Sequence, residues 1–201
     1  MSNRGCKGSG EQVRSKGTLP LILVCIIALF TSGLSSVSAV AAGPVICLYR
    51  VGNRGQDGAL LIKNYLEGKG YQVHVYQGEE TIEGHVQKAN LINRSGATVF
   101  LAIAIATGAE HALVVARTEA PQSSGHFLTV DEIPGRFAEE SQRLADSVAG
   151  ALGVKAKRMP LFPLLGITMP GIFLSIKGPE TDLAVVAKNL HMGLEKYFRK
   201  G

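Results

Sequence analysis

The chain has 201 residues, and its 21 Lys and Arg residues against 16 Asp and Glu residues give a formal net charge of +5. Part of that positive excess lies before residue 17, the chain has no Trp, and no basic stripe is interleaved with aromatic residues. This composition argues against a nucleic-acid partner. The mild basicity that remains suits an anionic cell-wall polymer or membrane surface.

The N-terminal segment has the three parts of an export signal. A basic lead precedes an apolar run over residues 19–30, and small residues follow over residues 35–42. This order is typical of a cleavable secretory peptide, and cuts after Ala39 or Ala41 fit the small-residue rule. An uncleaved anchor is the alternative, although a stable membrane span takes about 20 apolar residues. We therefore expect residues 1–42 to be a signal peptide or N-terminal membrane anchor, and the protein to be exported to the periplasm or cell envelope.

The remaining residues, 43–201, are enough for one domain. Cys6 and Cys25 lie in the leader, so the domain keeps only Cys47, inside an apolar run. A single cysteine forms no internal disulfide, and in such a run it is typically a small core residue. The domain is therefore expected to depend on its hydrophobic core alone.

Strand-like and helix-like segments alternate along the first half of this domain. Strands are expected over residues 44–49, 71–76, 98–105 and 112–116, the third being apolar almost throughout, as in a strand covered on both faces. A helix lies between the first two strands and stops at the glycines of residues 68–70. A second helix stops at residues 95–96. Their expected apolar stripes are Leu60, Leu61, Tyr65 and Leu66 in the first, and Ile82, Val86 and Ala89 in the second.

The second half continues the alternation after a surface loop predicted over residues 118–135. One helix has Phe137, Leu144, Val148 and Leu152 on one face, a central strand covers residues 171–176, and a closing helix carries an apolar stripe from Leu183 to Phe198. This order predicts the α/β class, with a mostly parallel twisted sheet and helices on both faces.

Three stretches resemble one enzyme family in order and spacing. They are LEGKGYQV at residues 66–73, VQKAN and SGATVFLAI at residues 86–90 and 95–103, and SQRLA and TMPGIFL at residues 141–145 and 168–174. Together the region from about residue 44 to 198 resembles the catalytic domain of zinc-dependent N-acetylmuramoyl-L-alanine amidases. The resemblance implies an amidase-like α/β domain over residues 43–201.

The resemblance also implies where the family's chemistry would lie. Such amidases hold zinc with His, Glu and His, and a further Glu acts as general base. On this chain Asn53 stands at the first histidine, Ala104 at the second and Ser175 at the base, while the ligand glutamate falls in a shortened connection near Gln56 and Asp57. We therefore expect vestigial active-site positions at Asn53, Ala104 and Ser175, with no catalytic residue, no metal and no other cofactor.

Other polar residues offer weaker candidates. No histidine pair has the spacing of a helical metal site, so an exposed or capping role is expected for His74, His85, His111, His126 and His191. Arg50, Arg54 and Lys177 fall at strand ends bordering the former active site, where open α/β sheets bind ligands. A cationic group there is expected to hold an anionic peptidoglycan fragment, although a solvated basic rim explains the same residues.

These observations give a first function and two rivals. The first is an exported amidase-like domain without hydrolytic activity, which binds peptidoglycan or muropeptide or regulates an envelope protein partner; the membrane is a partner only if the leader stays uncleaved. The second is an active cell-wall amidase with relocated ligands, such as Asp57 with a histidine from the long loop. The third is an interaction protein unrelated to cell walls.

Overall fold

The computed structural model describes residues 43–52, 55–118, 133–179 and 182–199. They build a six-stranded sheet in the order β2-β1-β3-β6-β4-β5. Strands β1, β2, β3 and β6 run parallel, β4 runs antiparallel to β6, and β5 runs parallel to β4. The strands are β1 (Val45–Arg50), β2 (Gln72–Gln77), β3 (Val99–Thr107), β4 (Ala112–Arg117), β5 (Ala156–Arg158) and β6 (Gly171–Gly178).

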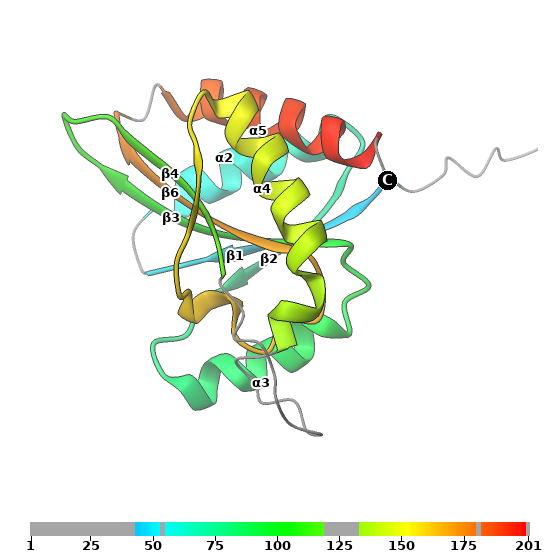
Figure 1. The fold of residues 1–201 in the computed structure, drawn as a ribbon. Coiled ribbons are helices and arrows are strands. Elements are labelled where there is room, and N and C mark those ends of the chain that lie inside the picture. The colour runs from blue at the N-terminus through cyan, green and yellow to red at the C-terminus, as the bar shows by residue number, and fades with distance from the viewer. Residues whose placement is uncertain (1–42, 53–54, 119–132, 180–181, 200–201) are drawn as a thin grey trace, which may run out of the picture. The chain divides into compact units, whose positions relative to one another are not determined.

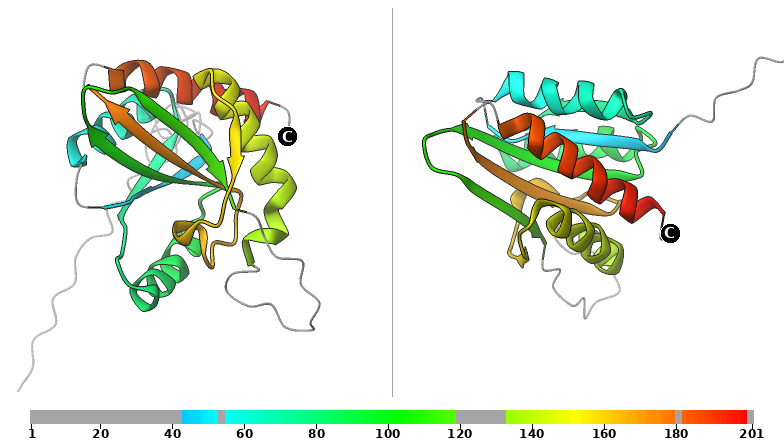
Figure 2. Two further views of the ribbon diagram at one scale, coloured as in Figure 1. Left: turned by 60° about the vertical axis from the view of Figure 1, so that its left-hand side comes forward. Right: turned by 90° about the horizontal axis from the view of Figure 1, so that it is seen from above.

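Helices cover both faces of this sheet (Figures 1 and 2). Three helices lie on one face: α2 (Gln56–Glu67), α4 (Ala138–Leu152), which follows the 3-10 turn η1 (Ile133–Phe137), and α5 (Leu183–Phe198). The other face carries α3 (Ile82–Asn93) and the 3-10 turn η2 (Phe162–Leu164). The predicted α/β class, with a mostly parallel sheet and helices on both faces, is confirmed.

Strand β3 shows why the sheet forms a two-sided core. Leu101 and Ile103 are fully buried under the three-helix face, whereas Phe100 and Ala102 are fully buried under the opposite face. Because successive side chains of a strand alternate between faces, a central strand with helices on both sides must be apolar at nearly every position. The apolar run read from the sequence is therefore this central strand.

The apolar stripes predicted for two helices are partly wrong. Leu60 and Leu61 of α2 are 42% and 38% exposed, and Ile82 of α3 is 60% exposed. Helix α2 buries Gly58 instead, where an added Cβ would lie 2.9 Å from Leu183 and 3.0 Å from Ile105. This glycine lets α2 approach α5 and the sheet closely, which turns its neighbouring leucines toward solvent.

Two further features differ from the sequence-based expectation. The short strand β5 was not expected, because its residues, Ala156-Lys157-Arg158, carry no apolar alternation. Most of the predicted loop over residues 118–135 lies outside the described residues. Its last three residues, 133–135, belong to the 3-10 turn η1. No helix in the described ranges is long and apolar enough to cross a membrane.

Candidate functional site

Four side chains form a row across the sheet near the carboxyl end of β3. Ala104 pairs with Ser175 of β6, and Ser175 pairs with Val114 of β4. On the other side of β3, the amide of Val51, just after β1, donates a hydrogen bond to the Ile103 carbonyl at 2.8 Å. All four residues are only partly buried. The carboxyl ends of β1, β3 and β6 therefore share one half-open surface, the carboxyl-edge row: Val51, Ala104, Ser175 and Val114.

Two of the predicted vestigial positions are direct neighbours in this row. The sequence alone placed Ala104 and Ser175 in separate segments, and the parallel register pairs them across β3 and β6. Asn53 and Arg54 lie outside the described residues, between Gly52 and Gly55 at the end of β1. Gly55, which follows them, packs against Ile105 of β3, on the sheet face opposite the row. Whether these positions are remnants of an active site stays a prediction.

A zinc ion does not fit the donor atoms of this row. Zinc in proteins binds histidine nitrogen, cysteine sulfur or carboxylate oxygen, whereas Val51, Ala104 and Val114 have no donor atom in their side chains and Ser175 offers a neutral hydroxyl. Nowhere in the part of the chain that the structure describes do three His, Cys, Asp or Glu side chains gather closely enough to hold a metal. The row has no carboxylate that could act as a general base.

Asp57, the carboxylate proposed as a relocated ligand, lies away from the row. It is exposed in the first turn of α2 and borders a hollow between α2 and α5 together with Leu60 and Tyr65. Helix α2 packs on the sheet face that contains Ile105. Ala104 and Ser175 point to the opposite face, since they alternate with Ile105 and Ile176 along their strands.

The predicted basic residues do not converge on one point. Lys177 stands two positions after Ser175 on the same strand face, and its Nζ donates to Glu110 Oε2 at 2.9 Å. Arg50 sits on the other face of β1, and its Nε donates to Gln77 Oε1 at 2.5 Å. Lys177 therefore borders the carboxyl-edge row, whereas Arg50 supports the β1–β2 pair.

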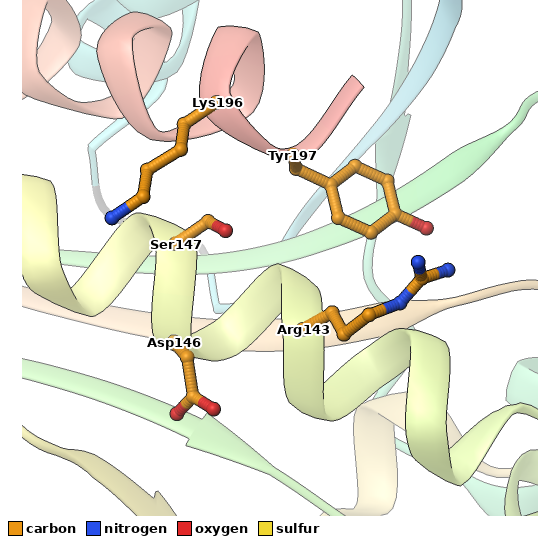
Figure 3. A pocket seen from close by; sticks show the side chains of 5 residues that line it. All are labelled: Arg143, Asp146, Ser147, Lys196 and Tyr197. Atoms are coloured by element: carbon orange, nitrogen blue, oxygen red, sulfur yellow. The ribbon is translucent and has the colours of Figure 1, made fainter. Parts of the chain in front are cut away.

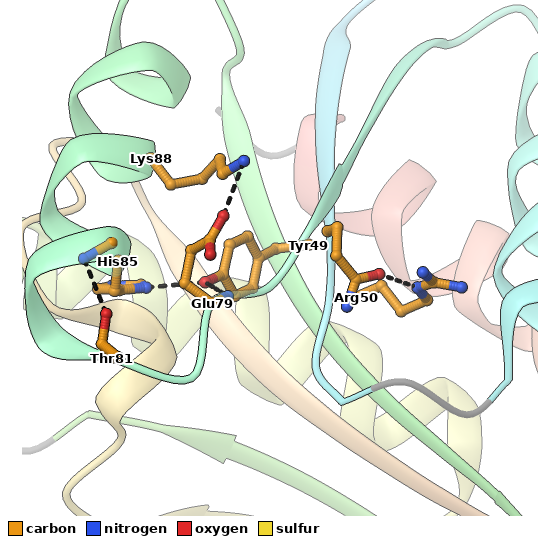
Figure 4. A network of polar contacts seen from close by, with 8 residues as sticks. Tyr49, Arg50, Glu79, Thr81, His85 and Lys88 are labelled. Carbon is orange, nitrogen blue, oxygen red and sulfur yellow. Dashed lines mark hydrogen bonds and ion pairs between the residues drawn. The ribbon is translucent and has the colours of Figure 1, made fainter.

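A buried polar network lies one step inward from the row. Tyr49 and His85 are 1% and 0% exposed, and the Tyr49 hydroxyl lies 2.9 Å from His85 Nδ1. The amide of Glu79 donates to the Tyr49 hydroxyl at 2.9 Å, and Glu79 also pairs with Lys88 at 2.9 Å. His85 Nε2 lies 3.0 Å from the Leu165 carbonyl. Figure 4 shows this network joining β1, α3 and the loop between β2 and α3.

The carbonyl partner fixes the proton positions in this network. A carbonyl oxygen only accepts, so His85 Nε2 carries the proton and donates it to Leu165, and Nδ1 accepts from the Tyr49 hydroxyl. Burial lowers the pKa of His85, although the Leu165 carbonyl and Glu79 act in the other direction. Burial likewise raises the pKa of Tyr49. Both side chains are therefore neutral at pH 7, and the network locks α3 onto β1.

The expected exposed or capping role is wrong for His85 and holds for some other histidines. His74 is exposed, and His111 is exposed and pairs with Asp182 at 2.6 Å. His191 is partly buried between the rings of Tyr65 and Tyr71. His126 lies outside the described residues. The burial of His85 was not predicted because its partner Tyr49 is 36 residues away in the sequence. The local sequence indicates it only through the helical spacing of His85 from the buried Ala89 and Ile92.

Comparison with known proteins adds a likeness in fold. No family model matches the chain, and no curated protein matches it. Among solved structures, the apo form of the N-acetylmuramyl-L-alanine amidase Ami1 from Mycobacterium abscessus is 16% identical, with a TM-score of 0.51 over 78% of this chain and 99% of that one. An N-acetylmuramoyl-L-alanine amidase from Clostridium difficile 630 is also 16% identical, with a TM-score of 0.51 over 80% and 100%. The chain therefore has the fold of these N-acetylmuramoyl-L-alanine amidases.

Proposed function

We propose that this protein is an exported amidase-like domain that binds peptidoglycan without hydrolysing it. The observation that carries the proposal is the carboxyl-edge row. Its position at the carboxyl ends of parallel strands is where α/β sheets bind ligands, and its Ala104–Ser175 pair lacks both a metal donor set and a carboxylate base. A domain can keep its fold when the side chains that carried out catalysis on it are replaced.

The leader supports the export part of the proposal. Residues 1–42 carry the basic lead, apolar run and small-residue tail of a secretory signal, so the domain over residues 43–201 would meet peptidoglycan in the periplasm or cell envelope. A muropeptide, rather than a protein, is the ligand that the likeness to cell-wall amidases favours. Regulation of an envelope protein partner is the further role open to such a domain.

The ligand would be held by charge instead of by a metal. Muropeptides carry carboxylates, and Lys177 is the cation that borders the row on the same face as Ser175. A carboxylate ligand would compete with Glu110 for the Lys177 ammonium group, which is easy because Glu110 is 84% exposed. We propose Arg54, which follows β1 in the sequence, as the second cation, and Arg50 as a support of the end of β1 through Gln77, which also bonds the Gly52 carbonyl.

Co-sedimentation of the protein with purified peptidoglycan sacculi tests this binding. The double variant Arg54→Ala/Lys177→Ala is expected to bind about tenfold more weakly, because an exposed ion pair is worth up to about 1 kcal/mol and a tenfold change in affinity is about 1.4 kcal/mol. Lys157→Ala/Arg158→Ala, which removes two exposed cations from β5, is the control of equal charge and should bind like the wild type. Equal binding by all three proteins would remove the proposed charge site, and no binding by the wild type would remove the function.

A further inference from the structure

The opposite end of the sheet, where β1 begins, has a distinct surface. Gly43 and Pro44 lead into β1 and border a hollow together with the last turn of α5 and the turn that follows α2. Figures 1 and 2 show the start of β1 and the end of α5 at the same end of the domain. We call this surface the amino edge, and its charged and aromatic members are Tyr65, Lys69, Tyr71, Lys196, Tyr197, Phe198 and Arg199.

Aromatic rings are concentrated at the amino edge. Tyr71 and Phe198 have ring centroids 5.9 Å apart, and Tyr197 and Phe198 have theirs 5.2 Å apart. Four of the twelve Tyr and Phe residues counted in the full sequence, five Tyr and seven Phe, therefore lie here once Tyr65 is included. Tyrosine and other amphipathic rings prefer the headgroup level of a bilayer, where one end of the ring is apolar and the other is wet.

Cations surround these rings. Lys69 lies over the Tyr65 ring at 5.5 Å, and Arg143 of α4 lies over the Tyr197 ring at 5.9 Å. Figure 3 shows Arg143 next to the Tyr197 ring. Lys69, Lys196 and Arg199 are all exposed. Three acidic residues lie among them: Glu195 pairs with Arg199 at 2.5 Å, Asp146 borders the hollow lined by Lys196 and Tyr197, and Glu140 lies near Tyr197. The four cations Lys69, Arg143, Lys196 and Arg199 therefore exceed the three anions by one charge.

The path of the chain points to what this surface meets. Residues 31–42, twelve residues, separate the apolar run ending at Phe30 from Gly43. Twelve fully extended residues span at most about 40 Å, so an inserted leader keeps the amino edge within that distance of the bilayer. Gly43 is fixed on the domain, because an added Cβ would lie 1.9 Å from the Gly70 carbonyl oxygen. The amino edge is thus the part of the domain that leads to the apolar run.

We infer that the amino edge docks on an anionic phospholipid bilayer. Lysine and arginine near such a surface each contribute about fivefold to binding. The half-buried rings of Tyr65 and Tyr197 would lie at headgroup level, whereas Tyr71 is buried in the domain core. Docking in this orientation also directs the carboxyl-edge row away from the membrane. Val99 and Ala104 are five residues apart on β3, which places the row about 17 Å further from the bilayer than the start of that strand.

Fluorescence of the full chain in lipid vesicles tests the docking directly. Cys6 and Cys25 are replaced by serine and Cys47 is buried, so one introduced cysteine takes an environment-sensitive dye. The dye is placed on Gln72→Cys, exposed at the start of β2, or on Glu110→Cys, exposed between β3 and β4 at the carboxyl end of β3. We expect a blue shift at position 72, and none at position 110, in vesicles containing phosphatidylglycerol but not in pure phosphatidylcholine.

A charge variant and its control complete the experiment. Lys69→Gln/Lys196→Gln should weaken the docked state about tenfold or more, and high salt should do the same by screening. Lys157→Gln/Arg158→Gln removes the same charge from the edge strand β5 and should leave the shift unchanged. An equal shift in neutral vesicles, a shift unaffected by the Lys69/Lys196 variant, or a shift removed by inorganic phosphate at constant ionic strength would overturn the inference; the last result would identify a phosphate site instead.

Discussion

Replacing His85 by leucine is expected to lower the free energy of unfolding by roughly 2–4 kcal/mol, as measured by urea denaturation at pH 7.5. Leucine fills a similar volume, so the loss comes from polar groups left without partners: the Tyr49 hydroxyl loses its acceptor and the Leu165 carbonyl loses its donor. A buried polar group without a partner costs about 1–3 kcal/mol. Without this lock, α3 and η2 would separate more easily from the sheet.

Two controls isolate the network. His74→Leu changes an exposed histidine on β2 and should stay within about 0.5 kcal/mol of the wild type. In a double-mutant cycle, Tyr49→Phe/His85→Leu should cost less than the sum of the single changes, because both remove the same hydrogen bond. Strictly additive effects would show that Tyr49 and His85 are not coupled, and a His85→Leu change within about 0.5 kcal/mol would show that His85 contributes little to stability.

The same histidine predicts how stability depends on pH. Burial holds the pKa of folded His85 below that of the unfolded chain, about 6.5. As pH falls through 6.5, the unfolded state binds a proton that the folded state does not, so stability falls, by at most about 1.4 kcal/mol per pH unit. The loss stops below the folded pKa of His85. His85→Leu should lack this part of the slope between pH 7 and 5, which urea titrations at several pH values would measure.

Gly55→Ala is expected to destabilise the domain by about 2–5 kcal/mol, because it combines two penalties. Gly55 has φ 80°, a left-handed conformation that costs a residue with a Cβ about 1–2 kcal/mol. An added Cβ would also lie 2.6 Å from Ile105 Cβ and 3.1 Å from the Ile105 carbonyl oxygen, and overpacking of this kind costs about 1–3 kcal/mol. Thermal or urea unfolding of the variant would measure the sum.

Gly52→Ala separates the two penalties. Gly52 has φ 78°, and among the described residues no atom lies within 4 Å of an added Cβ, so this variant keeps the conformational cost and lacks the clash. It should lose only about 1–2 kcal/mol. Equal losses in both variants would mean that the close approach of Gly55 to Ile105 adds no penalty of its own.

Much of this fold could be predicted from the sequence because its strongest signals are local. The apolar run of β3 and the glycines that end α2 depend on neighbouring residues alone. The buried sides of α2 and α3 depend on tertiary contacts: Gly58 lies between Leu183 and Ile105, and His85 between Tyr49 and Leu165. The burial of Gly58 and of His85 was not predicted, because the helical pattern was read from apolar side chains alone and neither glycine nor histidine counts as one.

The candidate site divides in the same way. The resemblance located Ala104 and Ser175 within their strands, but their pairing follows from the order β3-β6, which no local pattern encodes. The grouping of Arg50 with Lys177 was based on both being at strand ends. Strand alternation puts them on opposite faces, and each has its own polar partner. Position along a strand was predictable, whereas the direction of a side chain at a sheet edge required the register.

Zinc content and muropeptide turnover, measured together on the purified full chain, test most directly whether a cell-wall amidase scaffold persists here without its chemistry. After the protein is incubated with excess zinc and dialysed against metal-free buffer, we predict well below one equivalent of bound zinc. We also predict no cleavage of the bond between muramic acid and L-alanine. Stoichiometric zinc together with cleavage that a chelator abolishes would contradict this and would require ligands beyond the described residues.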